Sequence, residues 1–338
     1  MTNKTNHSRA ARRLGLAAGV AGVAAALATA GPAAAAPSNT AFVAHDTLIV
    51  KGSRNNDRIA LRLEAGVPGT LQVDFGDDGT AERSFDRATF SRINIFARAG
   101  HDQVRIDQVN GAFADEAVTM YGGRGNDRLD GGDGAELFLG GRGADAVDGN
   151  RGDDTGLLGA GRDSFRWDPG DGSDIVEGQR GFDTLDFNGA TGDEQMRLTP
   201  DGSRSLFLRT QGNIRMDMDG VEALDLTALD GVDTITLDDM SGTDFRQAAV
   251  DLQGAAGGPD GAADIVTVNG SAGADNIDLE TDGPVVVAEG LQTEVRLTGS
   301  ELDDKIQVNT LEGNDDVDVD GTVFALIDIG VDLGPGQR

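Results

Sequence analysis

The sequence of 338 residues contains no cysteine and few aromatic side chains. Without cysteine the chain forms no disulfide and offers no thiolate for catalysis or metal binding. The aromatic residues are 13 Phe, one Trp and one Tyr, which is too few for several large aromatic-centred cores. Another structural principle must therefore organise a chain of this length.

Positive charge is also scarce, with 28 Lys and Arg against 58 Asp and Glu and a formal net charge of −30. A chain without a basic stripe cannot release counterions from a polyanion, so we expect no nucleic-acid partner. Glutamate is rare as well, with 12 residues against 46 Asp. Because Asp favours turns and ligates hard cations, whereas Glu suits helices, this imbalance favours turn and ligand roles for the acids.

Glycine is the residue in excess, with 50 copies, about 15% of the chain against roughly 7% on average. Together with the 8 Pro this stays below the roughly 25–30% that is typical of low-complexity chains. No strict Gly-X-Y triplet is present, which excludes collagen. The composition therefore predicts a folded chain with many glycine turns.

The first 36 residues have the order of a secretory signal peptide. They contain no acid, and an apolar Ala- and Gly-rich stretch runs from Leu14 to about Ala30 and ends in Ala34-Ala35-Ala36 before Pro37. The basic residues before that stretch are Lys4, Arg9, Arg12 and Arg13. An uncleaved anchor is the alternative, and the pair Arg12-Arg13 leaves the Sec and twin-arginine routes both open. We expect a secreted chain, extracellular or held at the cell surface, without membrane insertion.

From Gly122 the sequence repeats in steps of nine residues. Five successive segments, starting at residues 122, 131, 140, 149 and 158, follow the pattern G-G-x-G-x-D-x-U-x, where U is apolar. The sixth position is acidic in all five: Asp127, Glu136, Asp145, Asp154 and Asp163. The eighth position holds Leu129, Phe138, Val147, Gly156 and Phe165. One further turn, which carries Asp174, follows after a two-residue insertion near Pro169.

This pattern resembles the calcium-binding nonapeptide of RTX (repeats-in-toxin, haemolysin-type) proteins. The resemblance implies a parallel β-roll with two nonapeptides per turn, in which Ca²⁺ lies between loops that are eighteen residues apart. It pairs Asp127 with Asp145, Glu136 with Asp154, and Asp145 with Asp163. The implied ligands are these acids and Asp174, together with the carbonyls of the loop glycines Gly122, Gly123, Gly125, Gly140, Gly141, Gly143 and Gly152.

The chemistry of each position agrees with that resemblance. Glycine tolerates positive φ and lets carbonyls converge, Asp supplies the hard oxygen that Ca²⁺ requires, and x-U-x is a short strand with one inward side chain. Glu136 departs from the pattern with its longer side chain, and Gly156 and Leu158 depart from it near the end. A flexible linker and a solenoid without metal are the alternatives.

An Asp-x-U-x-U phrase recurs on both sides of the repeat and predicts further strands that begin after an Asp turn. Between some of these phrases the chain makes hairpin excursions, over residues 57–102, 183–233 and 275–304. We interpret the flanking acids as turn formers rather than ligands, because their loops lack the full Gly-Gly-x-Gly. The phrases start at Asp57, Asp102, Asp183, Asp233, Asp264, Asp275, Asp304 and Asp316.

The sequence thus predicts an all-β chain, a β-solenoid in which a roll of calcium-binding nonapeptides is flanked by related β-rung and hairpin units. Residues 45–320 resemble, more broadly, secreted actinobacterial calcium-binding proteins with RTX repeats. We divide the chain into a signal peptide (1–36), an N-terminal β unit (37–120), the calcium-binding roll (121–178) and C-terminal β units (179–338).

No enzymatic activity is predicted. The chain lacks the H-E-x-x-H and G-x-S-x-G motifs, and outside the signal it has only His45 and His101, which we interpret as turn or surface residues. The predicted function is calcium binding that couples folding to extracellular Ca²⁺. Two alternatives stay open: an adhesin or matrix module with a cell-wall glycan or protein partner, and a calcium-dependent polysaccharide-active enzyme.

Overall fold

Nearly all regular structure in this chain is β-strand. The structure is a computed structural model that describes residues 39–335, so the predicted signal peptide and its cleavage site lie outside the described residues. Within residues 39–335 the only helices are three short 3-10 turns, η1 (Arg87–Thr89), η2 (Gln211–Asn213) and η3 (Val323–Ala325). In the same part of the chain, no helix is long and apolar enough to cross a membrane.

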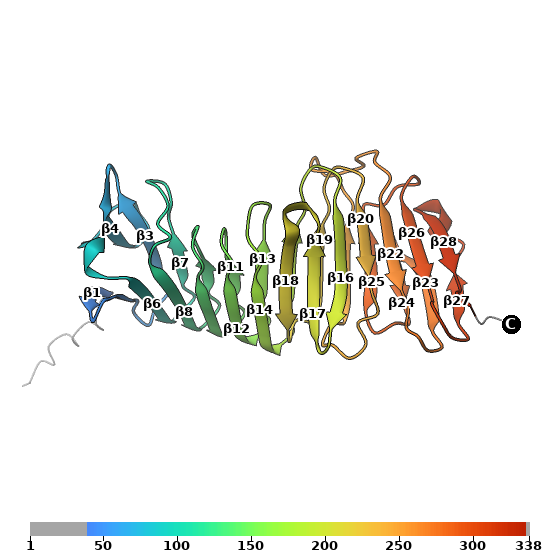
Figure 1. Cartoon of the computed structure of the whole chain (residues 1–338), viewed down its shortest axis with the longest axis horizontal. Coiled ribbons are helices and arrows are strands. Elements are labelled where there is room, and N and C mark those ends of the chain that lie inside the picture. The colour runs from blue at the N-terminus through green and yellow to red at the C-terminus, as the bar shows by residue number, and fades with distance from the viewer. Residues whose placement is uncertain (1–38, 336–338) are drawn as a thin grey trace, which may run out of the picture. The chain divides into compact units, whose positions relative to one another are not determined.

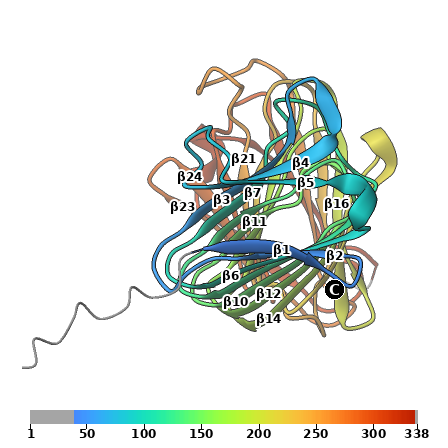
Figure 2. The ribbon, with the colours of Figure 1, turned by 90° about the vertical axis from the view of Figure 1, so that its left-hand side faces the viewer.

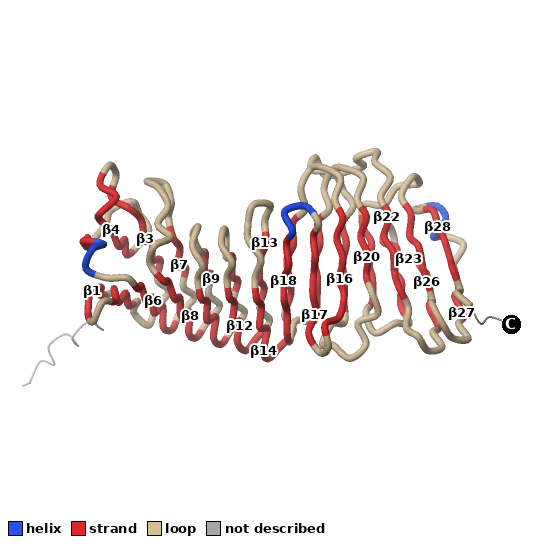
Figure 3. The backbone as a smooth tube through the Cα atoms, in the orientation of Figure 1, coloured by secondary structure: helices blue, strands red, loops and turns tan. Residues whose placement is uncertain are grey.

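The strands form two sheets of fourteen (Figures 1 and 3). In spatial order, the first sheet contains β1 (Thr40–Ala44), β2 (Thr47–Lys51), β6 (Arg92–Ala99), β8 (Ala117–Arg124), β10 (Leu137–Arg142), β12 (Thr155–Gly161), β14 (Ile175–Gly181), β18 (Ile214–Asp219), β17 (Arg204–Arg209), β16 (Gln195–Asp201), β20 (Thr234–Leu237), β22 (Ile265–Asn269), β26 (Lys305–Asn309) and β28 (Asp328–Asp332). The second contains β27 (Asp316–Val319), β23 (Asn276–Asp282), β24 (Val285–Glu289), β25 (Glu294–Thr298), β21 (Gln247–Asp251), β19 (Ala223–Thr227), β15 (Thr184–Asn188), β13 (Ser164–Trp167), β11 (Ala146–Asp148), β9 (Arg128–Asp130), β7 (Gln103–Ile106), β3 (Arg58–Glu64), β4 (Val67–Phe75) and β5 (Arg83–Asp86).

In the nonapeptide segment the chain alternates between the two sheets, with one strand in each sheet per turn. Strands β8, β10 and β12 are parallel neighbours in the first sheet, and β9, β11 and β13 are parallel neighbours in the second. Residues eighteen apart are register partners, as Leu137 is to Thr155. Figure 2 looks along this stack, and the two layers lie one above the other. The predicted all-β solenoid with a parallel roll is confirmed.

The hairpin excursions widen the sheets. Strands β16, β17 and β18 form an antiparallel meander inside the first sheet. At its two ends, β18 pairs in parallel with β14, and β16 pairs in parallel with β20. Strands β23, β24 and β25 do the same in the second sheet, and β3, β4 and β5 end that sheet at its other edge. The sheets run without a break across residues 121 and 179, and the predicted subdivision at these points stays a prediction.

The space between the sheets is filled by the apolar column of the repeat. Leu129, Phe138, Val147 and Phe165 are at most 1% exposed. Gly156, which departs from the pattern, faces the ring of Phe165: a methyl group at this glycine would stand 2.9 Å from Phe165 Cδ2. The aromatic ring therefore occupies the space that an apolar side chain has in the other repeats. Leu158, the second departure, is fully buried in the same core.

Candidate metal centre

The acids of the nonapeptides stand above one another, one per turn, at the starts of the strands. At the edge that leads into the second sheet, the Asp127 N–H donates to Asp145 Oδ1 at 2.8 Å, and the Asp145 N–H donates to Asp163 Oδ1 at 2.7 Å. We call these three residues the Asp127 ladder. The structure thus brings together two of the three loop pairs that the sequence analysis proposed as calcium sites.

The opposite edge of the roll carries a second ladder, which we call the Asp154 ladder. The Glu136 N–H donates to Asp154 Oδ1 at 2.7 Å, and the Asp154 N–H donates to Asp174 Oδ1 at 2.8 Å. The third proposed pair, Glu136 with Asp154, is therefore also in contact. In each of these contacts, which we call steps of the ladder, one carboxylate oxygen accepts the backbone N–H of the acid in the neighbouring turn. The second oxygen of that carboxylate remains for another partner.

In four of the six acids of the two ladders, the second carboxylate oxygen has no hydrogen-bond partner in the described part of the chain. The Oδ2 atoms of Asp127, Asp145, Asp154 and Asp163 are buried and unsatisfied, and these residues are only 1–3% exposed. A buried charged oxygen without a partner is costly, and natural sites resolve that cost with a cation or a proton. The roll repeats this feature at four positions.

Burial and mutual repulsion hold these carboxyls close to protonation when no cation is present. Burial raises the pKa of Asp145 to about 7 and that of Asp154 to about 9, and neighbouring carboxylates add to both increases. Burial also raises the pKa values of Asp127 and Asp163. A bound divalent cation would favour the ionised forms and offset the desolvation.

Backbone oxygens converge on the same place. A methyl group at Gly122 would stand 2.6 Å from the Gly140 carbonyl oxygen and 2.7 Å from Asp127 Oδ2. One carbonyl and one carboxylate oxygen therefore face a space that only glycine leaves open, and oxygen-only donor sets suit Ca²⁺. Most of the other proposed loop glycines have positive φ, between 113° and 133°: Gly123, Gly125, Gly141, Gly143 and Gly152.

One of the six proposed acid ligands, Glu136, has its second carboxylate oxygen satisfied by the chain itself. The Glu136 side chain turns back on its own loop, where Oε2 accepts the Gly132 N–H at 2.8 Å and the Gly134 N–H contributes a second hydrogen bond. Its longer side chain thus satisfies itself, which makes Glu136 the weakest of the proposed ligands. Asp174 is 2% exposed, and burial raises its pKa to about 7.

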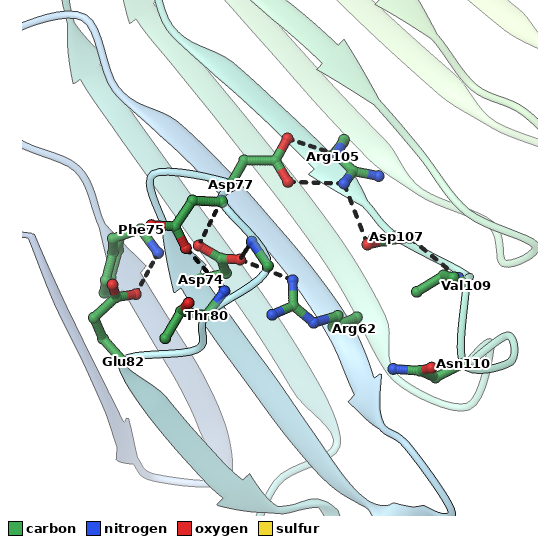
Figure 4. Close-up of polar contacts among 12 residues, drawn as sticks. Arg62, Asp74, Phe75, Asp77, Thr80, Glu82, Arg105, Asp107, Val109 and Asn110 are labelled. Carbon is green, nitrogen blue, oxygen red and sulfur yellow. Dashed lines mark hydrogen bonds and ion pairs between the residues drawn. The ribbon is translucent and has the colours of Figure 1, made fainter.

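Other carboxylates in the chain are paired with arginine side chains. Figure 4 shows Asp74 beside Arg62 at 2.8 Å, and Asp77 in a two-pronged contact with Arg105 at 2.7 and 2.8 Å. The Arg105 guanidinium lowers the pKa of Asp77. Among the described residues, no acid of the Asp127 or Asp154 ladder takes part in an ion pair.

The Asp127 ladder continues beyond the repeat, which the sequence analysis missed. The Asp102 N–H donates to Asp127 Oδ1, and the Asp163 N–H donates to Asp183 Oδ1, both at 2.8 Å. The Oδ2 atoms of Asp102 and Asp183 are also buried without a partner. The signal for this was the Asp-x-U-x-U phrase, which puts an acid at the strand start without the Gly-Gly-x-Gly loop.

The remaining candidates for metal or catalytic chemistry are few. Within residues 39–335 no group of three or more His, Cys, Asp and Glu side chains is placed to hold a metal ion. His45 lies in the turn between β1 and β2. His101 Nδ1 accepts the Asn126 N–H at 2.8 Å, beside the loop that precedes Asp127.

No protein-family model matches the chain, and no match is found among the curated proteins. Among solved structures, the chain is similar to the extracellular lipase LipA from Serratia marcescens, with 15% identity and a TM-score of 0.19. The match covers 65% of this chain and 44% of the lipase, so the chain spans less than half of that protein's length.

This comparison contradicts the prediction that the chain is not an enzyme, because the similar structure is that of an enzyme. The prediction is therefore withdrawn. A likeness with a TM-score of 0.19 places no catalytic residue in this chain.

Proposed function

We propose that the chain is a secreted RTX-type calcium-binding protein, whose Gly/Asp loops bind Ca²⁺ between stacked turns of the roll. The observation that carries this proposal is the row of buried Oδ2 atoms without a partner at Asp127, Asp145, Asp154 and Asp163. Glycine carbonyls face the same spaces, as Gly140 O does beside Asp127 Oδ2. Calcium prefers oxygen ligands of both kinds.

Calcium in these loops would couple binding to folding. The stacked acids touch only when turns eighteen residues apart are already in register, so the site does not exist in the unfolded chain. The free energy of binding then adds to the free energy of folding. Without the ion, buried carboxyls and a formal net charge of −30 oppose the compact state.

Secretion supplies the ion in this proposal. The N-terminal 36 residues have the order of a signal peptide, and the extracellular space holds far more free Ca²⁺ than the interior of a cell. Because the chain has no cysteine, bound Ca²⁺ would provide the cross-link between turns that disulfides cannot provide here. N-terminal sequencing of the exported chain checks this part: a mature chain that starts at Pro37 supports it, and a retained N-terminus contradicts it.

A calcium titration of the secreted chain tests the binding itself. Isothermal titration with CaCl₂, and with MgCl₂ as the comparison ion, gives the number of ions bound. The test variant changes Asp127, Asp145, Asp154 and Asp163 to Asn, which keeps the Oδ1 acceptor of each step and removes the charge. We expect this variant to lose most of the bound Ca²⁺. An unchanged titration curve would overturn the proposed function.

A further inference from the structure

A third ladder of acids lies far from the nonapeptides, at the starts of strands β16, β20, β22 and β26. The Glu194 N–H donates to Asp233 Oδ1 at 2.8 Å, the Asp233 N–H donates to Asp264 Oδ1 at 2.8 Å, and the Asp264 N–H donates to Asp304 Oδ1 at 3.0 Å. We call these four residues the Asp233 ladder. All four are at most 2% exposed.

The two ends of this ladder are satisfied by the protein. Glu194 forms a buried ion pair with Arg209, and its Oε2 accepts the Ala190 N–H at 2.8 Å. Asp304 Oδ2 accepts the Glu301 N–H at 2.7 Å. The two inner acids have no such partner, because Asp233 Oδ2 and Asp264 Oδ2 are buried without any hydrogen bond in the described residues.

The charges around these two oxygens are negative. Beside the ladder itself, Asp260 acts on both carboxyls and Glu301 acts on Asp264, and each of these influences raises a pKa. Burial is the larger cause, and the pKa of Asp233 rises to about 7 and that of Asp264 to about 6. Like the acids of the nonapeptide ladders, neither Asp233 nor Asp264 forms an ion pair with a Lys or Arg of the described residues.

We propose that a Ca²⁺ ion also binds between the turns at Asp233 and Asp264, with both Oδ2 atoms as ligands. The choice of calcium rests on the proposed function. The loops before these acids carry no Gly-Gly-x-Gly, and 31 residues rather than eighteen separate the two acids. The site is therefore assigned by the two unsatisfied buried oxygens and not by the repeat motif.

The same criterion excludes other acids that start strands. Asp57 Oδ2 accepts the Ser53 N–H at 2.6 Å, and Asp275 Oδ2 accepts the Ser271 N–H at 2.8 Å. A neighbouring serine thus fills the place that a cation would take. These acids cap their own loops, and Asp275 provides a matched control because it lies in the same C-terminal half.

The test counts bound Ca²⁺ in the purified secreted chain by equilibrium dialysis. We expect the double variant D233N/D264N to bind one Ca²⁺ fewer than the wild type, whereas D275N binds the full number. An equal count in D233N/D264N and wild type overturns the inference, while a wild type that binds no Ca²⁺ overturns the proposed function. The two failures are therefore distinguishable.

Hydrogen exchange shows where in the chain Ca²⁺ acts, and it distinguishes the loss of one site from a general folding defect of the variant. In the wild type, Ca²⁺ should slow amide exchange in peptides that cover residues 229–268 as well as in those that cover 122–178. In D233N/D264N the effect of Ca²⁺ should vanish from 229–268 and persist in 122–178. Calcium-dependent protection that stays in 229–268 contradicts the inference, even if the total count changes.

Discussion

The nonapeptide roll and the C-terminal part of the solenoid contain the same hydrogen bond between stacked acids, but different numbers of residues separate the two acids. In the roll, acids that touch are eighteen residues apart, as Asp127 and Asp145 are, whereas Asp264 and Asp304 touch across 40 residues. The additional residues form loops and antiparallel strands such as β23 and β24. The stacked acid at the strand start is therefore a property of the solenoid, and the Gly-rich nonapeptide is its shortest version.

The two regions differ in how the second carboxylate oxygen is satisfied. In the roll it is left without a protein partner at four positions. In the C-terminal part the partners vary, with Arg209 at Glu194, a backbone N–H at Asp304 and a serine at Asp275. The roll should therefore depend on Ca²⁺ at these four positions, and the C-terminal part where Oδ2 is likewise without a partner, at Asp183, Asp233 and Asp264.

The largest effect is expected from the double variant D145N/D163N. Asp145 belongs to both steps of the Asp127 ladder, so its loss removes charge from two proposed sites at once. A site that is saturated at about 100 Kd adds about 2.7 kcal/mol to stability. We expect the rise of Tm with Ca²⁺ to shrink strongly, as measured by differential scanning calorimetry.

The matched control for that variant is D57N, since Asp57 also starts a strand but accepts hydrogen bonds from Ser53. We expect D57N to keep the wild-type increase of Tm on addition of Ca²⁺. An equal response to Ca²⁺ in D145N/D163N and wild type would show that the two kinds of acid do not differ.

A smaller effect is expected from G140A. The added methyl group would press against the Leu158 carbonyl and stand 2.8 Å from Oδ2 of the proposed ligand Asp145. Such overpacking typically costs about 1–3 kcal/mol. We expect both a lower Tm and a weaker Ca²⁺ affinity in calorimetric titration. G192A is the control, because nothing lies within 4 Å of a methyl group there; equal Ca²⁺ affinities in the two variants would refute the assignment.

The smallest expected effect is a change in how stability depends on pH. Burial raises the pKa of Asp145 to about 7, above an ordinary value near 4, so the folded chain without Ca²⁺ binds more protons than the unfolded chain. That contribution to stability is complete below pH 4 and is lost as the pH rises toward 7.

Calcium should reverse that trend, because the ion competes with protons for the same oxygens. Urea unfolding between pH 5 and 7.5 checks this: the midpoint should fall with pH in EDTA and rise with pH in Ca²⁺. Parallel pH profiles in the two buffers would contradict the competition.

The sequence was sufficient to predict the roll because its information is local. The period of nine puts an acid at position six and an apolar residue at position eight. The resemblance to the RTX nonapeptide implies two repeats per turn, and the contact of Asp127 with Asp145 follows from it. The same pattern could not show that Phe165 fills the space beside Gly156, because that compensation depends on the packing between neighbouring turns.

What the sequence could not predict depends on contacts between distant segments. The hairpins could be expected from alternating strands and glycine turns, but the insertion of β16, β17 and β18 within a parallel sheet depends on how they pair. Likewise, Asp264 and Asp275 each begin an Asp-x-U-x-U phrase, and only the residues around their side chains distinguish them. A serine four residues before Asp275 is close enough to satisfy it, while the oxygen of Asp264 has no such donor.

Coupling of calcium to folding is tested most directly by comparing the wild-type chain in EDTA and in millimolar Ca²⁺. Far-UV circular dichroism reports the sheets, and the single Trp167 reports the end of the roll: it is fully buried, stacks on Phe187 at 4.1 Å and donates to the Gly172 carbonyl. We predict a weaker β signal and red-shifted tryptophan emission in EDTA, where the roll is loosened, and a stronger β signal with blue-shifted emission after Ca²⁺ is added. Identical spectra and identical melting in the two buffers would contradict the account.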